Sequence, residues 1–206
     1  MKRRIKKIMT AELNRYFFQK KETDQYLKFL IVSQCAPFLK RMRAASLLTI
    51  SDGTKIQMVS LLSQTEIMWR ELGTDKGKSI CILYRESDLK ELLGRPENHH
   101  ILYINGYPDI NSENLVEIQL KELKKRMKQF ISKGKFPHEI GVFLGYPASD
   151  VEQFIEQDGQ NYKMNGYWKV YDHVMDAARI FSAYDQARML AVNELLLGYD
   201  LKMICR

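Results

Sequence analysis

FPHEIGVFLGYPASDVEQFIEQDGQNYKMNGYWKVY, residues 136–171, sets Pro, Gly, aromatic and charged residues close together with little filler. In its first half an apolar segment ends at Gly145-Tyr146-Pro147, and an amphipathic stretch follows. Glycine readily takes the left-handed backbone conformation that ends a helix, and proline suits the first turn of the next helix. The pattern predicts two helices joined at a Gly-Tyr-Pro corner, followed by a glycine-bracketed loop and a strand within 162–171.

The same turn occurs earlier in the chain, at Gly106-Tyr107-Pro108. The preceding residues 99–105 suit a strand or a helix, and their place before this turn favours the helix. Behind the turn, residues 112–133 have apolar side chains at helical spacing, with the basic run KELKKRMK opposite them. We therefore expect two helix–Gly-Tyr-Pro–helix corners, which reflect either an ancient duplication or a good turn used twice.

The remaining patterns complete a mixed fold. A helix over 24–34 should be interrupted at Cys35-Ala36-Pro37, because proline lacks the N–H group that continues a helix. The expected fold class is α/β (α+β), predominantly helical around a small sheet of about three strands. These strands lie near 46–50, 79–85 and 162–171, and the other expected helices cover 38–43, 55–72, 87–93 and 172–197.

The charge of the chain is concentrated at its beginning. Of the 206 residues, 1–45 hold 12 Lys and Arg against 3 Asp and Glu, while 46–206 hold 20 against 22. We expect a basic N-terminal extension, residues 1–21, and one globular domain, residues 22–206. The extension is either a frayed helix with a solvated face or a basic amphipathic helix that contacts nucleic acid or an acidic membrane.

Cysteine usage and hydropathy indicate the compartment. The three cysteines, Cys35, Cys81 and Cys205, form neither an even disulfide framework nor a CxxC metal motif. The longest apolar run, FLIV at 29–32, is far shorter than the roughly 20 residues of a membrane span. We therefore expect a cytoplasmic protein with reduced thiols, no transmembrane segment and no export signal.

The segment 137–157 has the spacing of a DNA-binding helix-turn-helix. Its second helix holds Asp150, Glu152 and Glu156 and no Lys or Arg, and these carboxylates would be repelled by phosphates. A packing role for this corner is therefore favoured over DNA binding.

His138 and Cys35 are the candidate reactive residues. His138 and Glu139 stand at the start of a helix, where His138 suits a metal ligand, a general base or a packing role. Cys35 is a small buried hydrophobe, a thiol that pairs with His138 as nucleophile and base, or, together with His138, one of two ligands of a metal or haem site. Residue 142 is valine, so the HExxH zinc motif is absent, and no metal site is predicted.

The run GYWKVY at 166–171 is the second candidate site. In a strand, Tyr167, Lys169 and Tyr171 share one face and Trp168 lies on the other. The Tyr/Lys/Tyr face suits a planar or anionic ligand, and the competing interpretation is a lysine stem that covers aromatic rings. The chain lacks a Walker loop, a GxGxxG motif and a GxSxG motif, which argues against the common kinds of nucleotide-dependent chemistry and leaves any cofactor unknown.

Two of these pieces, FPHEIGVFLGYP and GYWKVY, resemble the signature of an uncharacterised bacterial family, domain-of-unknown-function family 3793. Cys35-Ala36-Pro37 and the first Gly-Tyr-Pro also match, and the resemblance covers most of residues 24–190. Because the family has no assigned activity, it implies no catalytic residue. The extension 1–21 lies outside the resemblance.

The leading hypothesis is a binding or accessory protein whose small-molecule or protein partner docks at a shared site. The candidate ligand-binding residues are His138, Glu139, Tyr146, Tyr167, Trp168, Lys169 and Tyr171. One alternative is an enzyme that uses Cys35 and His138. The other is a nucleic-acid-binding protein that uses the basic N-terminal arm and the helix-turn-helix-like corner.

Overall fold

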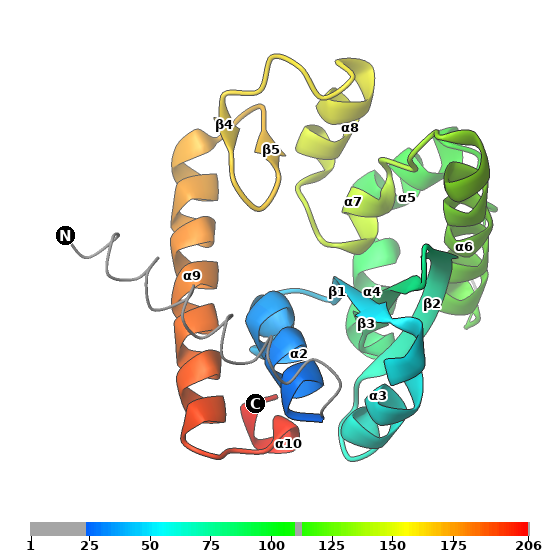
Figure 1. Ribbon diagram of the computed structural model, residues 1–206. Coiled ribbons are helices and arrows are strands. Elements are labelled where there is room, and N and C mark those ends of the chain that lie inside the picture. Colours follow the sequence, from blue (N-terminus) through cyan, green and yellow to red (C-terminus); the bar gives the residue numbers. More distant parts are fainter. Residues whose placement is uncertain (1–23, 110–112, 206) are drawn as a thin grey trace.

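A three-stranded antiparallel sheet separates two groups of helices in the computed structural model, which describes residues 24–109 and 113–205 (Figure 1). Its strand order is β1-β3-β2, with β3 in the centre. The strands are β1 (Ala45–Ser51), β2 (Met68–Asp75) and β3 (Lys78–Tyr84). The N-terminal extension predicted at 1–21 lies outside the described residues.

The register of the sheet sends alternate side chains to opposite faces. Leu47 pairs with Ile82 and faces one helical layer, whereas the next pair, Leu48 with Cys81, faces the other. Because each face carries apolar residues, helices are needed on both sides to exclude water.

One face is covered by α2 (Asp24–Leu39), α3 (Lys55–Leu62), α9 (Val174–Leu196) and α10 (Leu201–Ile204). The other face is covered by α4 (Glu86–Leu93), α5 (Pro96–Ile104), α6 (Leu115–Lys133) and α7 (Ile140–Phe143). A smaller cluster holds the hairpin of β4 (Met164–Asn165) and β5 (Lys169–Val170) against the first half of α9. Helix α8 (Ala148–Glu156) lies beside this hairpin, and a short 3-10 turn, η1 (Asp52–Thr54), follows β1 (Figure 1).

Both Gly-Tyr-Pro corners are confirmed, and they share one backbone geometry. Gly106 and Gly145 have φ of 80° and 68°. At each corner the glycine N–H donates to the carbonyl three residues back, and the tyrosine N–H donates to the carbonyl five residues back. This pair of bonds is the Schellman ending, which satisfies two carbonyls of the last helical turn.

The predicted helix over 55–72 is wrong in its second half. Helix α3 ends at Leu62, and residues 68–75 form β2 instead. Thr65 Oγ1 donates to the Leu62 carbonyl and accepts from the Ile67 N–H, so a side chain takes over bonds that a continuing helix would make. The edge of β3 then recruits the following residues into the sheet.

The predicted break at Pro37 is also wrong, because α2 continues through it to Leu39. Proline stands in the last turn of α2, where its missing N–H costs one bond. The chain then leaves the helix through a Schellman ending, with Arg41 at φ of 56° in the place usually held by glycine. Residues 38–43 therefore do not begin a new helix.

Of the three predicted strands, those near 46–50 and 79–85 are confirmed as β1 and β3, and 172–197 is confirmed as α9. The third strand of the sheet is β2, whereas residues 162–171 form only the separate β4–β5 hairpin. The hairpin turns tightly around Gly166, whose N–H bonds to the Trp168 carbonyl. This turn divides the predicted Tyr/Lys/Tyr face.

Candidate functional site

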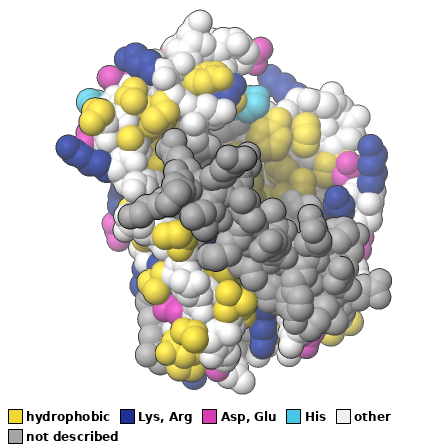
Figure 2. Space-filling model, turned by 60° about the vertical axis from the view of Figure 1, so that its left-hand side comes forward, with side chains coloured by type: hydrophobic (Ala, Val, Ile, Leu, Met, Phe, Trp, Pro, Cys, Tyr) yellow, Lys and Arg dark blue, Asp and Glu magenta, His cyan; other side chains and the backbone are white. Residues whose placement is uncertain are grey.

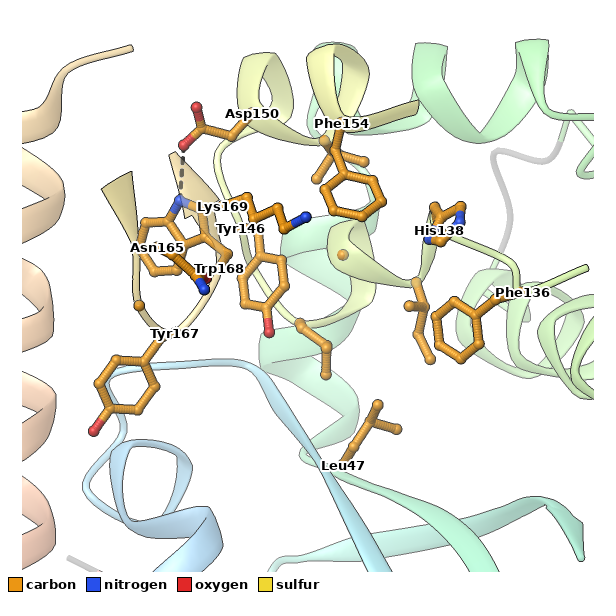
Figure 3. Close-up of a pocket in the computed structure, with 15 residues that line it drawn as sticks. Leu47, Phe136, His138, Tyr146, Asp150, Phe154, Asn165, Tyr167, Trp168 and Lys169 are labelled. Carbon is orange, nitrogen blue, oxygen red and sulfur yellow. Dashed lines mark hydrogen bonds between the residues drawn. The ribbon is translucent and has the colours of Figure 1, made fainter. Parts of the chain in front are cut away.

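A cavity of about 330 Å³ lies between the second Gly-Tyr-Pro corner and the β4–β5 hairpin (Figure 3). Residues from β1, from the segment 136–154 and from the hairpin form its wall. In the space-filling view, a hollow with hydrophobic side chains lies beside a histidine (Figure 2). The cavity is lined by Leu47, Phe136, His138, Ile140, Gly141, Leu144, Tyr146, Asp150, Val151, Phe154, Asn165, Gly166, Tyr167, Trp168 and Lys169.

Asp150 fixes one side of this cavity. It projects from the first turn of α8 and is only 4% exposed. Its carboxylate accepts hydrogen bonds from Trp168 Nε1 at 2.7 Å, from the Tyr171 N–H at 2.8 Å and from the Asp172 N–H at 3.3 Å (Figure 3). A buried carboxylate with three donors is a strong anchor, so Asp150 ties α8 to the hairpin and to the residues that follow it.

Aromatic rings supply most of the surface. Tyr146 stacks on Trp168, with ring centroids 5.3 Å apart. On the other side, the ring of His138 lies 5.4 Å from that of Phe136 and 4.8 Å from that of Phe154. Aromatic rings on the wall of a cavity offer apolar surface to the ring of a ligand.

Lys169 brings a positive charge to this aromatic surface. Its Nζ donates to the Gly159 carbonyl at 2.6 Å and lies 5.4 Å from the centre of the Phe154 ring and 4.7 Å from that of Tyr162. A cation over ring faces is attracted to them, so the ammonium is held in place. An ammonium has three N–H donors, and one bond to a carbonyl leaves donors for a ligand.

Gly141 allows its neighbours to pack closely beside the cavity. A Cβ at this position would lie 2.9 Å from Val151 Cγ2 and 3.0 Å from Tyr146 Cδ2. Any side chain here must therefore displace a neighbour, and the missing side chain is why α7 and α8 pack so closely beside the cavity.

Five of the seven predicted ligand-binding residues line this cavity: His138, Tyr146, Tyr167, Trp168 and Lys169. Glu139 does not, because it is buried and accepts from Tyr107 Oη at 3.2 Å and from Arg126 Nη1 at 3.4 Å. Tyr171 also lies outside the lining. Its hydroxyl is buried without a hydrogen-bond partner among the described residues, and burial raises its pKa.

Cys35 is not brought to this cavity. It lies on α2 with no exposed surface, and its Sγ is 3.9 Å from the Leu47 carbonyl oxygen, as a weak donor. Burial raises the pKa of the Cys35 thiol to about 11, so the nucleophilic thiolate is scarce at neutral pH. The pair of Cys35 and His138 therefore gains no support from the geometry. In the described parts of the chain, no group of three or more His, Cys, Asp or Glu residues could hold a metal ion.

Several lining residues were not predicted as site residues. Phe136 lies two residues before His138, and Phe154 lies on the following helix, α8. Both line the cavity, and their aromatic character is the sequence signal that could have identified them. Asp150 appeared to be a surface charge that opposes DNA binding, yet it is an internal anchor. Of the three acidic residues of this helix, only Glu152 and Glu156 are left to repel the phosphates of DNA.

The chain belongs to the family described as "Protein of unknown function (DUF3793)", whose model matches residues 31–205. The whole cavity lies within this match. No curated protein and no solved structure matches the chain. Among the helices described, none has both the length and the apolar character that crossing a bilayer requires.

Proposed function

We propose that this protein binds a small, planar, largely apolar molecule in the cavity between the second Gly-Tyr-Pro corner and the hairpin. The observation that carries the proposal is the set of aromatic side chains that line a cavity of about 330 Å³. Cavities of roughly 300–1,000 Å³ with apolar walls and a few polar groups are typical of small-molecule sites. Free thiols at Cys35, Cys81 and Cys205 fit a reducing compartment such as the cytoplasm.

The polar groups of the cavity suit recognition of a ligand. His138 and Lys169 present nitrogen atoms to the cavity, and Tyr146 carries a hydroxyl (Figure 3). A planar ligand that stacks on Tyr146 and Trp168 would gain apolar contact, and a polar substituent would meet Lys169 or His138.

Binding is favoured over catalysis because of what the wall contains. The lining residues include no Ser, Thr or Cys that His138 could activate as a nucleophile. Asp150 already accepts three hydrogen bonds and is engaged as a structural anchor. The remaining groups can orient a molecule and provide its specificity.

The test uses the indole N–H signals of the two tryptophans in a nitrogen-labelled protein. The variant Trp69→Phe assigns the signal of Trp168, which lies in the cavity wall. We expect 2-naphthol to shift the Trp168 signal saturably and the Trp69 signal very little. Decahydro-2-naphthol, a saturated analogue of the same skeleton, should bind several-fold more weakly because it cannot stack.

Two variants complete the experiment. Tyr146→Ala should weaken 2-naphthol binding about tenfold, which corresponds to the loss of one aromatic contact. Tyr199→Ala, which removes an exposed tyrosine beyond α9, is the matched control and should leave binding unchanged. Equal binding by both variants, or no saturable shift of the Trp168 signal, would refute the proposal. If the proposal holds, native mass spectrometry of protein from its own host would identify the natural ligand.

A further inference from the structure

A second cavity, of about 260 Å³, lies where the ends of α2 and β3 meet α10 and the loop before β2. It shares no lining residue with the aromatic cavity. Its wall is formed by Arg41, Gln64, Thr65, Glu66, Ile67, Arg85, Lys202 and Cys205. Three of these eight side chains are basic and one is acidic, so the lining has a surplus of two positive charges.

Arg85 is the unusual member of this group. It follows β3 directly and is only 3% exposed. Its guanidinium donates to the Phe38 carbonyl at 2.9 Å and to the Leu39 carbonyl at 3.4 Å, and it lies 4.7 Å from the centre of the Phe38 ring. These contacts hold the Arg85 guanidinium against the C-terminal end of α2.

The partners of Arg85 do not neutralise its charge. Backbone carbonyls carry no net charge, and no carboxylate forms an ion pair with Arg85 within residues 24–109 and 113–205. A buried charge without a directly paired carboxylate is costly, and a guanidinium has five N–H donors, of which these bonds use two. Arg85 can therefore still bind an anion from the cavity.

Arg41 stands beside it in a strained conformation. Its φ of 56° is the left-handed region that usually requires glycine. The guanidinium is 2.7 Å from Glu66 and 3.9 Å from Asp88, and it is half-exposed. This ending of α2 holds a second guanidinium at the rim of the cavity, where an anion could compete with Glu66.

We propose that this cavity binds a small oxyanion, a carboxylate or phosphate group, between Arg85, Arg41 and Lys202. The planar fork of arginine matches the oxygen atoms of both groups, and the lysine adds a third positive charge at the mouth. The site is independent of the aromatic cavity and of the function proposed for it. The competing explanation is that Arg85 only stabilises the end of α2, in which case anions should have no specific effect.

Cys205 offers a direct readout, because it lines this cavity and is half-buried, whereas Cys35 and Cys81 have no exposed surface. The folded full-length protein is treated with iodoacetamide, a neutral reagent, at pH 9, because burial raises the pKa of the Cys205 thiol to about 11 and enough thiolate must form to react. The rate of Cys205 alkylation is followed by peptide mass spectrometry. We expect inorganic phosphate to slow the reaction saturably, by at least about threefold, compared with sodium chloride at equal ionic strength. An acetate series shows whether a carboxylate protects equally.

Variants locate the protection. Arg41→Ala removes one cation and releases the Glu66 carboxylate, so the phosphate concentration for half protection should rise about tenfold. Lys202→Ala should raise it several-fold, because Lys202 is exposed and screened. The matched control is Arg179→Ala, since Arg179 is an exposed arginine on α9 that also pairs with a carboxylate, Asp176, at 3.1 Å. This control should behave as the unchanged protein.

The outcomes separate cleanly. Protection by phosphate alone would assign a phosphate group to the site, and protection by both salts a general oxyanion site. Protection by acetate alone would assign a carboxylate group. Phosphate and acetate that both protect no better than chloride would overturn the proposal. So would Arg41→Ala and Lys202→Ala proteins that are protected as well as the Arg179→Ala control. Circular dichroism of each variant establishes that it is folded before it is alkylated.

Discussion

The two Gly-Tyr-Pro corners have the same backbone and different surroundings. In each, a left-handed glycine and the following tyrosine close the preceding helix with the same pair of hydrogen bonds. Tyr107 of the first corner is 3% exposed and donates its hydroxyl to Glu139, while Arg126 lies 4.6 Å from the centre of its ring. Tyr146 of the second corner is half-buried, stacks on Trp168 and lines the aromatic cavity.

One position explains much of this difference. The tyrosine N–H of the first corner bonds to the carbonyl of Leu102, and that of the second bonds to the carbonyl of Gly141. Leu102 fills the core beneath its corner, whereas Gly141 has no side chain and borders the cavity. A repeated local motif thus fixes how a helix ends, and the neighbouring side chains decide whether the corner is packed or open.

Truncation of the two tyrosines should separate the corners most strongly. Tyr107→Ala removes a buried ring and deprives Glu139 of a donor, so we expect the free energy of unfolding to fall by about 3–5 kcal/mol. Tyr146→Ala removes a half-exposed ring and should cost only about 1–2 kcal/mol. Urea denaturation of both variants measures the two losses. Losses of equal size would show that the second corner is as firmly packed as the first.

Asp150→Asn tests the carboxylate anchor of the second corner. The asparagine keeps one accepting oxygen, whereas the aspartate accepts from three N–H groups, two of them in buried positions. We expect a loss of about 1–3 kcal/mol in the free energy of unfolding. The emission of Trp168, recorded in a Trp69→Phe background, should shift to longer wavelength as the hairpin loosens.

The control for this anchor is Glu152→Gln on the same helix, which should change stability by about 0.5 kcal/mol or less. If both variants lose the same stability, the Asp150 bonds are not what holds the hairpin.

Alkaline pH should act on the first corner through Tyr107. Burial, and then the nearby charge of Glu139, raise the pKa of the Tyr107 hydroxyl above its ordinary value of about 10. Above about pH 10 the unfolded chain releases this proton while the folded chain keeps it, so stability falls as pH rises, by up to about 1.4 kcal/mol per pH unit. Tyr107→Phe removes this contribution. Urea denaturation between pH 9.5 and 11 should therefore show a shallower decline for the variant, and parallel curves would contradict the assignment.

The parts of the fold that could be predicted are those determined by residues close together in the sequence. The corners, α9, β1 and β3 follow from glycine, proline and apolar spacing within a short window. The strand β2 does not, because MWRELGTD is compatible with a helix until β3 offers it an edge. Pro37 was misjudged because one missing N–H is tolerated in the last turn of a helix.

The candidate site could likewise be predicted only in part. His138, Tyr146 and Lys169 were identified from motifs, and they meet at one cavity. The cavity itself was not predictable, since its wall joins Leu47 from a distant strand to the segment around Gly141. The role of Asp150 was also hidden, because its bond to Trp168 spans 18 residues and a carboxylate in a first helical turn usually faces water.

Gly141→Ala makes the second corner more like the first and should have the smallest effect on stability. Alanine favours a helix by up to about 1 kcal/mol over glycine, and this gain is offset because the new methyl group must displace Val151 or Tyr146. We therefore expect the free energy of unfolding to change by about 1 kcal/mol or less. Binding of 2-naphthol should nevertheless weaken roughly fivefold, because the displaced Tyr146 ring no longer stacks as before. If the variant is equally stable and binds 2-naphthol unchanged, the contact with Gly141 does not set the position of the Tyr146 ring.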